Sequence, residues 1–244
     1  MLKNKANRDK YTILEFKWSN FSEFEKKQIL TETDILYKET NSLSANTGLI
    51  RSPEKKYIDS LSGIMAEFAT TKFFNDFLNE NWSAIRPIFE SSKNQIDISL
   101  NYKEEIYNVE VRSSFVKNGI NFALYATNNQ GKTYFDVLGT YKQNSYKSNF
   151  ESVKDLFIRV LFDISDENFE QFYKKRNVFI DKYINKDEPF YIIGGMSGKS
   201  IIKKGYKKTL VKKDLSSYSS NIKEGEYNVA EISNIYDIEH FMNL

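Results

Sequence analysis

The chain has 244 residues, of which 40% are hydrophobic and 15% aromatic, so it is long enough to bury a core as a single domain, residues 1–244. It has no cysteine and one histidine, His240, which excludes disulfides, thiolate metal sites and sites built from several histidines. Its 35 basic residues nearly balance its 33 acidic ones, so a net charge of +2 does not by itself indicate a nucleic-acid partner.

The N-terminal part of the chain, residues 1–55, is predicted to be a helical appendage. Ser22 and Glu25 have the spacing of a capping box, and apolar residues follow them at helical intervals. The first sixteen residues are too charged for the centre of a signal peptide. No apolar run approaches the roughly twenty residues that cross a membrane. We therefore expect a cytoplasmic protein with no membrane partner.

A second helix is predicted around residues 63–69. Its apolar stripe consists of residues four positions apart: Leu61, Met65, Ala69, Phe73 and Phe77. Glu67 lies in this helix. It is either a solvated side chain on a packing helix or an acid that belongs to a functional site.

Residues 95–114 are predicted to form a β-hairpin, because apolar and polar side chains alternate in two successive runs. A four-residue loop at 102–105 would place Asn101 opposite Ile106. The same register puts all the apolar side chains on one face. It also places Asp97 directly opposite Glu110. A shift of one residue would turn the apolar side chains outward, so the register is well specified.

Two opposed carboxylates on a strand pair have Cβ atoms roughly 4.5–5.5 Å apart and repel each other. A divalent cation would relieve that repulsion, because Mg²⁺ binds oxygen ligands, commonly one or two carboxylates with water and phosphate. The main-chain carbonyl of Val111 offers a third oxygen. The alternative without a functional role is a hairpin whose charged face is simply exposed to solvent.

Beyond the hairpin, the sequence predicts a long buried strand over residues 154–164, a helix over 166–178 and a strand over 189–194. Residues 194–200 end in Gly-Lys-Ser like a phosphate-binding loop. Ile193 stands where that loop needs glycine, so a glycine-rich turn is the better interpretation.

The strongest basic run follows in the predicted C-terminal extension, residues 196–244. Its lysines have no acid among them before Asp214 and comprise Lys199, Lys203, Lys204, Lys207, Lys208, Lys212 and Lys213. They would form either a phosphate-contacting surface or a solvated loop.

Asp97, followed after twelve residues by Glu110-Val111-Arg112, resembles the motif of the PD-(D/E)xK nucleases, the superfamily that includes most type II restriction endonucleases. In that superfamily a helix with a further acid often precedes the hairpin, and Glu67 matches that acid. The resemblance covers roughly residues 60–195. The sequence departs from the motif at Ile96, where proline is usual, and at Arg112, where the motif has lysine.

The resemblance implies an α/β fold with a restriction-endonuclease-like mixed β-sheet flanked by helices. It also implies a metal-dependent endonuclease that cleaves double-stranded DNA, with Mg²⁺ or Mn²⁺ bound by Asp97, Glu110, Val111 and Glu67. Arg112 would act electrostatically on the scissile phosphate, since arginine cannot serve as a general base. DNA-phosphate contacts are expected from Ser113, Ser114 and the lysine run, and a homodimer is expected by analogy.

Three alternatives remain open from the sequence. A lysine from elsewhere, Lys132, Lys147 or Lys154, could take the place of the motif lysine. The protein could be a DNA-binding nuclease fold that has lost cleavage, with Arg112 as the mark of that loss. It could also be an interaction module with an acidic surface hairpin.

Overall fold

The computed structural model describes residues 2–5, 10–40, 51–87, 96–126, 136–143, 154–204, 206–210 and 225–242. Its described strands form one seven-stranded sheet, ordered β1-β2-β8-β7-β5-β4-β3, and a three-stranded sheet, ordered β6-β10-β9. The strands are β1 (Leu2–Lys5), β2 (Lys10–Phe16), β3 (Trp82–Ile85), β4 (Ile98–Tyr102), β5 (Glu105–Val116), β6 (Asp136–Gln143), β7 (Leu156–Asp163), β8 (Phe190–Ser197), β9 (Tyr206–Leu210) and β10 (Gly225–Glu231).

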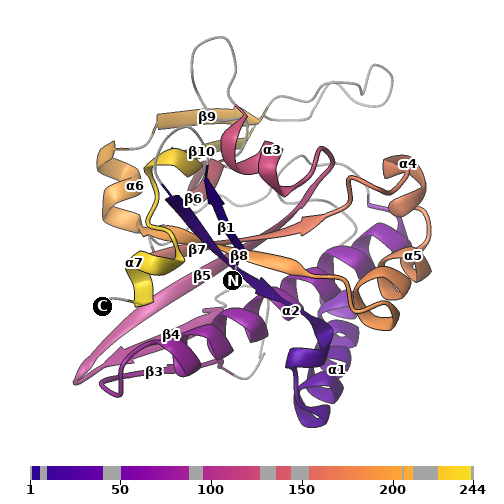
Figure 1. The fold of residues 1–244 in the computed structure, drawn as a ribbon, viewed down its shortest axis with the longest axis horizontal. Coiled ribbons are helices and arrows are strands. Elements are labelled where there is room, and N and C mark those ends of the chain that lie inside the picture. Colours follow the sequence, from indigo (N-terminus) through magenta and orange to yellow (C-terminus); the bar gives the residue numbers. More distant parts are fainter. Residues whose placement is uncertain are drawn as a thin grey trace.

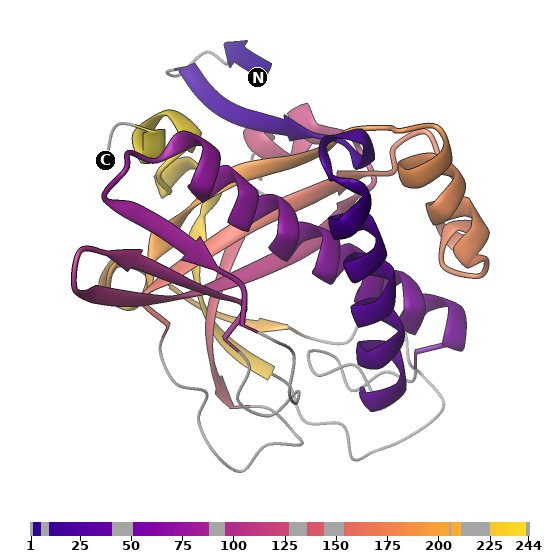
Figure 2. The same cartoon turned by 90° about the horizontal axis from the view of Figure 1, so that it is seen from below.

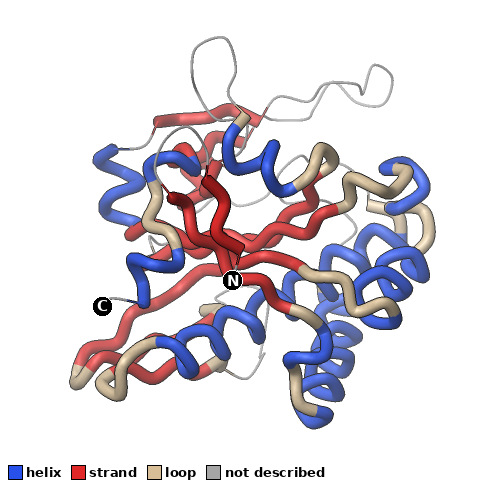
Figure 3. The backbone as a smooth tube through the Cα atoms, viewed as in Figure 1, coloured by secondary structure: helices blue, strands red, loops and turns tan. Residues whose placement is uncertain are grey.

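The large sheet is mixed, because β5 and β7 run parallel while its other neighbouring strands pair antiparallel. Parallel neighbours need a long crossover connection. Here the chain between β5 and β7 contains α3 and β6. The predicted α/β class with a mixed sheet is therefore confirmed, and Figure 3 shows the strands at the centre with helices around them.

Helices cover the large sheet. They are α1 (Glu23–Glu39), α2 (Pro53–Phe77), α3 (Ile120–Tyr125), α4 (Phe169–Phe172), α5 (Arg176–Ile180), α6 (Gly198–Lys204) and α7 (Ile238–Met242), with single turns at Trp18–Asn20, Asp181–Asn185 and Ile232–Asn234. In Figure 1, α1 and α2 lie below the sheet, and α3 and the small sheet lie above it. Figure 2 shows α2 (purple) running along the sheet, with α1 (indigo) lying across α2. None of the helices in the described ranges has both the length and the apolar character to cross a bilayer.

Side-chain alternation along β7 divides the core into two layers. Ile158, Val160 and Phe162 pack with the buried face of α2. Phe157 and Leu161 point to the opposite face and pack with residues of α3, α6 and β10. Both faces of β7 are therefore buried, which explains its nearly continuous apolar sequence.

The hairpin forms with the predicted register: Ile98 pairs with Val109, Leu100 with Tyr107 and Asn101 with Ile106. The loop is shorter than predicted. Tyr102 pairs with Glu105, so only Lys103 and Glu104 form the turn, with Lys103 at a φ of 54°. The alternation fixed the register independently of the loop length.

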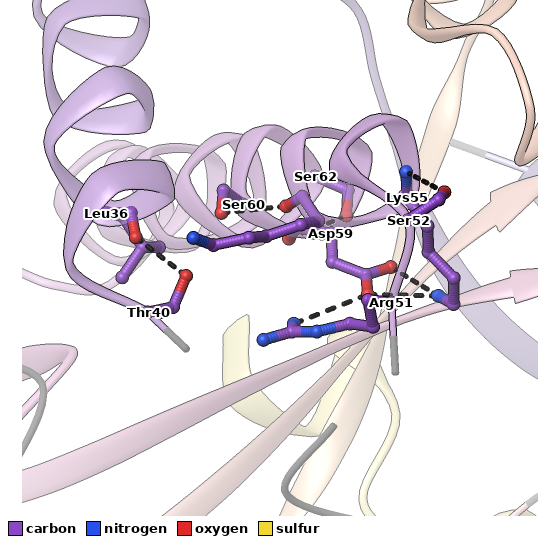
Figure 4. A network of polar contacts seen from close by, with 9 residues as sticks. Leu36, Thr40, Arg51, Ser52, Lys55, Asp59, Ser60 and Ser62 are labelled. Carbon is purple, nitrogen blue, oxygen red and sulfur yellow. Dashed lines mark hydrogen bonds and ion pairs between the residues drawn. The ribbon is translucent and has the colours of Figure 1, made fainter. Parts of the chain in front are cut away.

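Helix α2 begins at a strong N-terminal signal. Ser52 caps it by accepting a hydrogen bond from the Lys55 backbone N–H at 3.1 Å, and Pro53 occupies its first turn. Asp59 then binds Lys55 Nζ at 2.8 Å and Arg51 Nη1 at 3.5 Å, a network drawn in Figure 4. These contacts fix the start of the helix that carries Glu67.

Two predicted segments differ from the structure. The predicted helical segment 1–55 begins instead with β1 and β2, and β2 pairs with β8 in the large sheet. Ile13 and Leu14 of β2 are buried. The strand is short and has charged residues on either side of them, so its sequence does not indicate a strand. The predicted helix 166–178 is divided into α4 and α5 at Lys175, which is extended at a φ of −142°.

The predicted glycine-rich turn is also wrong, since β8 runs through it and continues directly into α6. Gly194 has a φ of +113°, and a Cβ there would lie 2.1 Å from the Tyr236 carbonyl oxygen. A Cβ on Gly195 would lie 2.1 Å from the Phe157 carbonyl oxygen. These glycines allow close approach of neighbouring backbones.

Candidate functional site

Three acids from different elements form what we call the acidic cluster: Glu67, Asp97 and Glu110. Glu67 comes from the middle of α2, Asp97 immediately precedes β4, and Glu110 lies in β5. Their exposed fractions are 7%, 8% and 8%. The two hairpin acids are therefore buried, and the alternative of a hairpin with a solvent-exposed charged face is wrong.

Asp97 is held in place by the neighbouring strand. Its Oδ2 accepts a hydrogen bond from the Val111 backbone N–H at 2.7 Å. The pairing between β4 and β5 ends at Ile98 and Val109, next to Asp97. The Asp97 side chain therefore provides a hydrogen-bond acceptor where the main-chain pairing of β4 stops. Val111 thus contributes its N–H to the cluster. The role predicted for its carbonyl as a metal ligand stays a prediction.

The acids are crowded electrostatically. Burial raises the pKa of Asp97 well above its usual value, and repulsion from Glu110 and Glu67 raises it further against the Val111 hydrogen bond and Arg112. Burial likewise raises the pKa of Glu67 to about 7, against the lowering effect of Arg86 and with repulsion from Glu110 and Glu32. Each acid of the cluster therefore affects the protonation of another, as expected where negative charge is concentrated away from water.

Arg112 lies beside the cluster. Its Nη2 is 3.1 Å from Glu110 Oε1, and its side chain is 20% exposed. Alternation along β5 puts Glu110, Arg112 and Ser114 on one face and Ser113 on the other. Both serines are half-buried. The two serines predicted to contact DNA therefore face opposite sides of the sheet, and Ser114 shares the face of Glu110.

Sequence reasoning missed the partners of Glu67. Arg86, just after β3, donates a hydrogen bond from Nε to Glu67 Oε2 at 2.8 Å, and its Nη2 forms an ion pair with the same oxygen at 2.6 Å. It also donates from Nη1 to Glu32 Oε2, which comes from α1. No local pattern marks Arg86 in the sequence. The general requirement that a buried carboxylate be paired was the one signal that such a cation exists.

The predicted DNA-contacting lysines lie in the C-terminal part of the fold. Lys199 and Lys203 are exposed on α6, and Lys204 ends that helix. Lys207 and Lys208 lie on β9, but their side chains are outside the described part of the structure, as are residues Lys212 and Lys213.

Of the alternative lysines, Lys154 is buried two residues before β7. The next residue, Asp155, donates its backbone N–H to the Asn108 carbonyl at 2.9 Å. This contact places Lys154 beside the part of β5 that precedes Glu110. Lys132 and Lys147 lie outside the described residues.

The cluster contains carboxylate oxygens, which are the ligand type that hard divalent cations prefer. Asp97 uses Oδ2 for Val111 and Glu67 uses Oε2 for Arg86, so one oxygen of each carboxylate accepts no hydrogen bond from the described residues. Within the described ranges, no three His, Cys, Asp or Glu side chains are arranged to hold a metal ion. Mg²⁺ needs no such set, because it commonly binds through one or two carboxylates with water and substrate phosphate.

The charges point the same way. Among the groups whose contacts are described above, Glu32, Glu67, Asp97 and Glu110 carry four negative charges when ionised, and Arg86 and Arg112 carry two positive ones. Either protons or a divalent cation can neutralise this excess.

No protein-family model, curated protein or solved structure matches the chain. The function is therefore inferred from the geometry and charge of the site itself.

Proposed function

We propose that the protein is a metal-dependent endonuclease that hydrolyses phosphodiester bonds in double-stranded DNA, of the restriction-like kind. The observation that carries the proposal is the burial of Asp97 beside Glu110 at the point where β4 meets β5, with the raised pKa of Asp97 as its consequence. Placing like charges close together away from water lowers the stability of the fold. Carboxylates with pKa values perturbed in this way are typical of functional sites.

The residues have distinct roles in this proposal. Asp97 and Glu110 would hold Mg²⁺ or Mn²⁺ through carboxylate oxygens, and Glu67 would complete the site or orient water. The bound ion supplies charge neutralisation and a lowered pKa for water. Arg112 would contact the scissile phosphate, because its guanidinium stays charged and presents several donors.

The architecture supports the same proposal. A helix carrying an acid, α2, precedes the hairpin, and the hairpin belongs to a mixed sheet covered by helices. These features agree with what the PD-(D/E)xK resemblance implies. A restriction-endonuclease-like fold, a homodimer and a cytoplasmic location belong to the proposal.

One observation favours a second candidate, a DNA-binding nuclease fold without cleavage. Arg112 stands in the motif's lysine position and pairs with Glu110 at 3.1 Å. A guanidinium there already neutralises part of the charge that would attract the metal. On this interpretation the chain binds DNA and the acidic cluster is a remnant.

A plasmid assay separates the two candidates. Supercoiled DNA is incubated with the protein in MgCl₂ or in EDTA, with Asp97→Asn and Glu110→Gln as test variants. Glu104→Gln, in the exposed hairpin turn, is the matched control. The nuclease predicts nicking or linearisation that needs Mg²⁺ and is lost in both test variants but not in the control. DNA binding without cleavage supports the second candidate, and the absence of both contradicts both.

A further inference from the structure

The outer edge of β3 is closed by hydrogen bonds from its own chain. Among the described strands, β3 is the last of the seven-stranded sheet and pairs antiparallel with β4 (Figure 1). In an antiparallel pair, successive residues direct their N–H and C=O groups alternately towards the partner strand and away from it. The groups that point away form a row of donors and acceptors with which a strand of another molecule can pair.

Asn75, in the last turn of α2, occupies these outward groups at Ala84. Its Nδ2 donates to the Ala84 carbonyl at 3.0 Å, and its Oδ1 accepts from the Ala84 N–H at 2.8 Å. One side-chain amide thus makes the two hydrogen bonds that a residue of a neighbouring strand would make. Two residues earlier on the same side of β3, the Trp82 N–H donates to the Asn79 carbonyl at 3.0 Å. Both outward N–H groups of this strand are therefore taken up within the chain.

The helix itself does not explain an asparagine at position 75. Asparagine forms helices less well than alanine, and this side chain is exposed rather than packed in the core. Ile85, the next residue along β3 from Ala84, is 58% exposed, so the edge also presents apolar surface to water. Natural sheets protect such edges against pairing with other chains. The two hydrogen bonds to Ala84 give Asn75 that protective position.

We propose that Asn75 is an edge-blocking residue, which prevents β3 from pairing with β3 of a second copy of this chain. A second copy fits the edge because two identical strands can pair antiparallel about a two-fold axis. Ala84 would then offer one donor and one acceptor to its counterpart, and exposed apolar surface at Ile85 would be buried. The inference requires neither a metal nor DNA, so it does not rest on the proposed function.

The test measures the mass of the full-length protein by sedimentation over a range of concentrations. In Asn75→Ala the average mass should rise reversibly with concentration towards twice the wild-type value, whereas Asp76→Ala, an exposed neighbour in the same helical turn, should match the wild type. Alanine is the better helix former, so the substitution does not weaken α2. In dilute Asn75→Ala the Ala84 amide should exchange its hydrogen faster than in the wild type, and the exchange should slow at concentrations where the variant associates.

A second substitution identifies the surface through which the variant associates. Lysine on an edge strand opposes pairing with another strand. Asn75→Ala combined with Ile85→Lys should therefore return to the wild-type mass at every concentration. Association that persists in this double variant would place the contact elsewhere and overturn the inference.

An Asn75→Ala mass equal to that of the wild type would also overturn it, whether or not the Ala84 amide exchanges faster. Irreversible aggregation with a lowered stability in urea would show that Asn75 only supports the fold, and would overturn the inference equally. None of these results bears on the proposed nuclease activity, which the plasmid assay measures separately.

Discussion

Glu67 should make the metal-free protein less stable as the pH rises through neutrality. Its pKa is about 7 in the folded protein against an ordinary value of 4.5, chiefly because it is buried. The folded state therefore keeps its proton over a range in which the unfolded chain has released it. The stabilisation is fully present below pH 4.5 and is lost as the pH rises through about 7.

The size of the effect follows from the same values. One pKa unit corresponds to about 1.4 kcal/mol, so the gap between 4.5 and about 7 corresponds to about 3 kcal/mol of unfolding free energy. Asp97 adds to the loss with the same sign, because its pKa is also raised. The hydrogen bond from Lys186 lowers the pKa of Asp181, so that group acts in the opposite direction and only at more acidic pH.

Urea unfolding in EDTA at several pH values between 5 and 8 measures this loss. Part of the loss occurs below pH 5, so in Glu67→Gln the decrease in stability across this range should be smaller than in the wild type by roughly 2–3 kcal/mol. The exposed control Glu104→Gln should follow the wild type. A wild-type stability that is constant or rises over this range, or an equal decrease in Glu67→Gln, would refute the crowding of charge in the cluster.

Four further outcomes are expected. Asp97→Asn should retain the fold, because the amide oxygen can still accept a hydrogen bond from the Val111 N–H. It should lose Mg²⁺-dependent stabilisation in a melting assay, and stabilisation equal to wild type would contradict the role of Asp97 as a metal ligand. Mg²⁺ binding near pH 7 should release protons and become tighter as the pH rises. Proton release is measured by calorimetry, as the difference in binding enthalpy between two buffers of different ionisation enthalpy. An enthalpy that does not depend on the buffer would count against the raised pKa values. Arg112→Lys should preserve plasmid cleavage while Arg112→Met should abolish it, and equal activity of the two would remove Arg112 from the reaction. Gly195→Ala should destabilise the protein by about 3 kcal/mol or more in urea unfolding, because its Cβ would collide with the Phe157 carbonyl; a neutral effect would contradict the packing of β8 on β7.

The hairpin was predictable because two physical constraints agree on it. Alternation demanded that Ile98 and Val109 share the buried face, and they do. The observed pairing ends at this pair, so the predicted pairing of Asp97 with Glu110 is not part of it; Asp97 instead accepts a hydrogen bond from the Val111 N–H. The turn was predicted less well. Residues 102–105 are all polar or amphipathic, and composition alone does not show that Tyr102 and Glu105 pair rather than loop out.

The surroundings of the cluster depend on contacts distant in sequence. Glu32, Glu67 and Arg86 come from three elements, and nothing in their local sequences links them. The same holds for β2, which is recognisable as a strand only once β8 is beside it. Periodicity therefore predicted the hairpin that carries Asp97 and Glu110, whereas contacts between distant elements determine how Glu67 is held.

The most direct measurement is anomalous diffraction from crystals of the protein soaked in MnCl₂. We predict an anomalous peak between the carboxylates of Asp97 and Glu110, with Glu67 turned towards it, and no peak there in crystals of Asp97→Asn. Ordered density for these side chains without a peak, or with the two hairpin carboxylates turned apart into solvent, would contradict it.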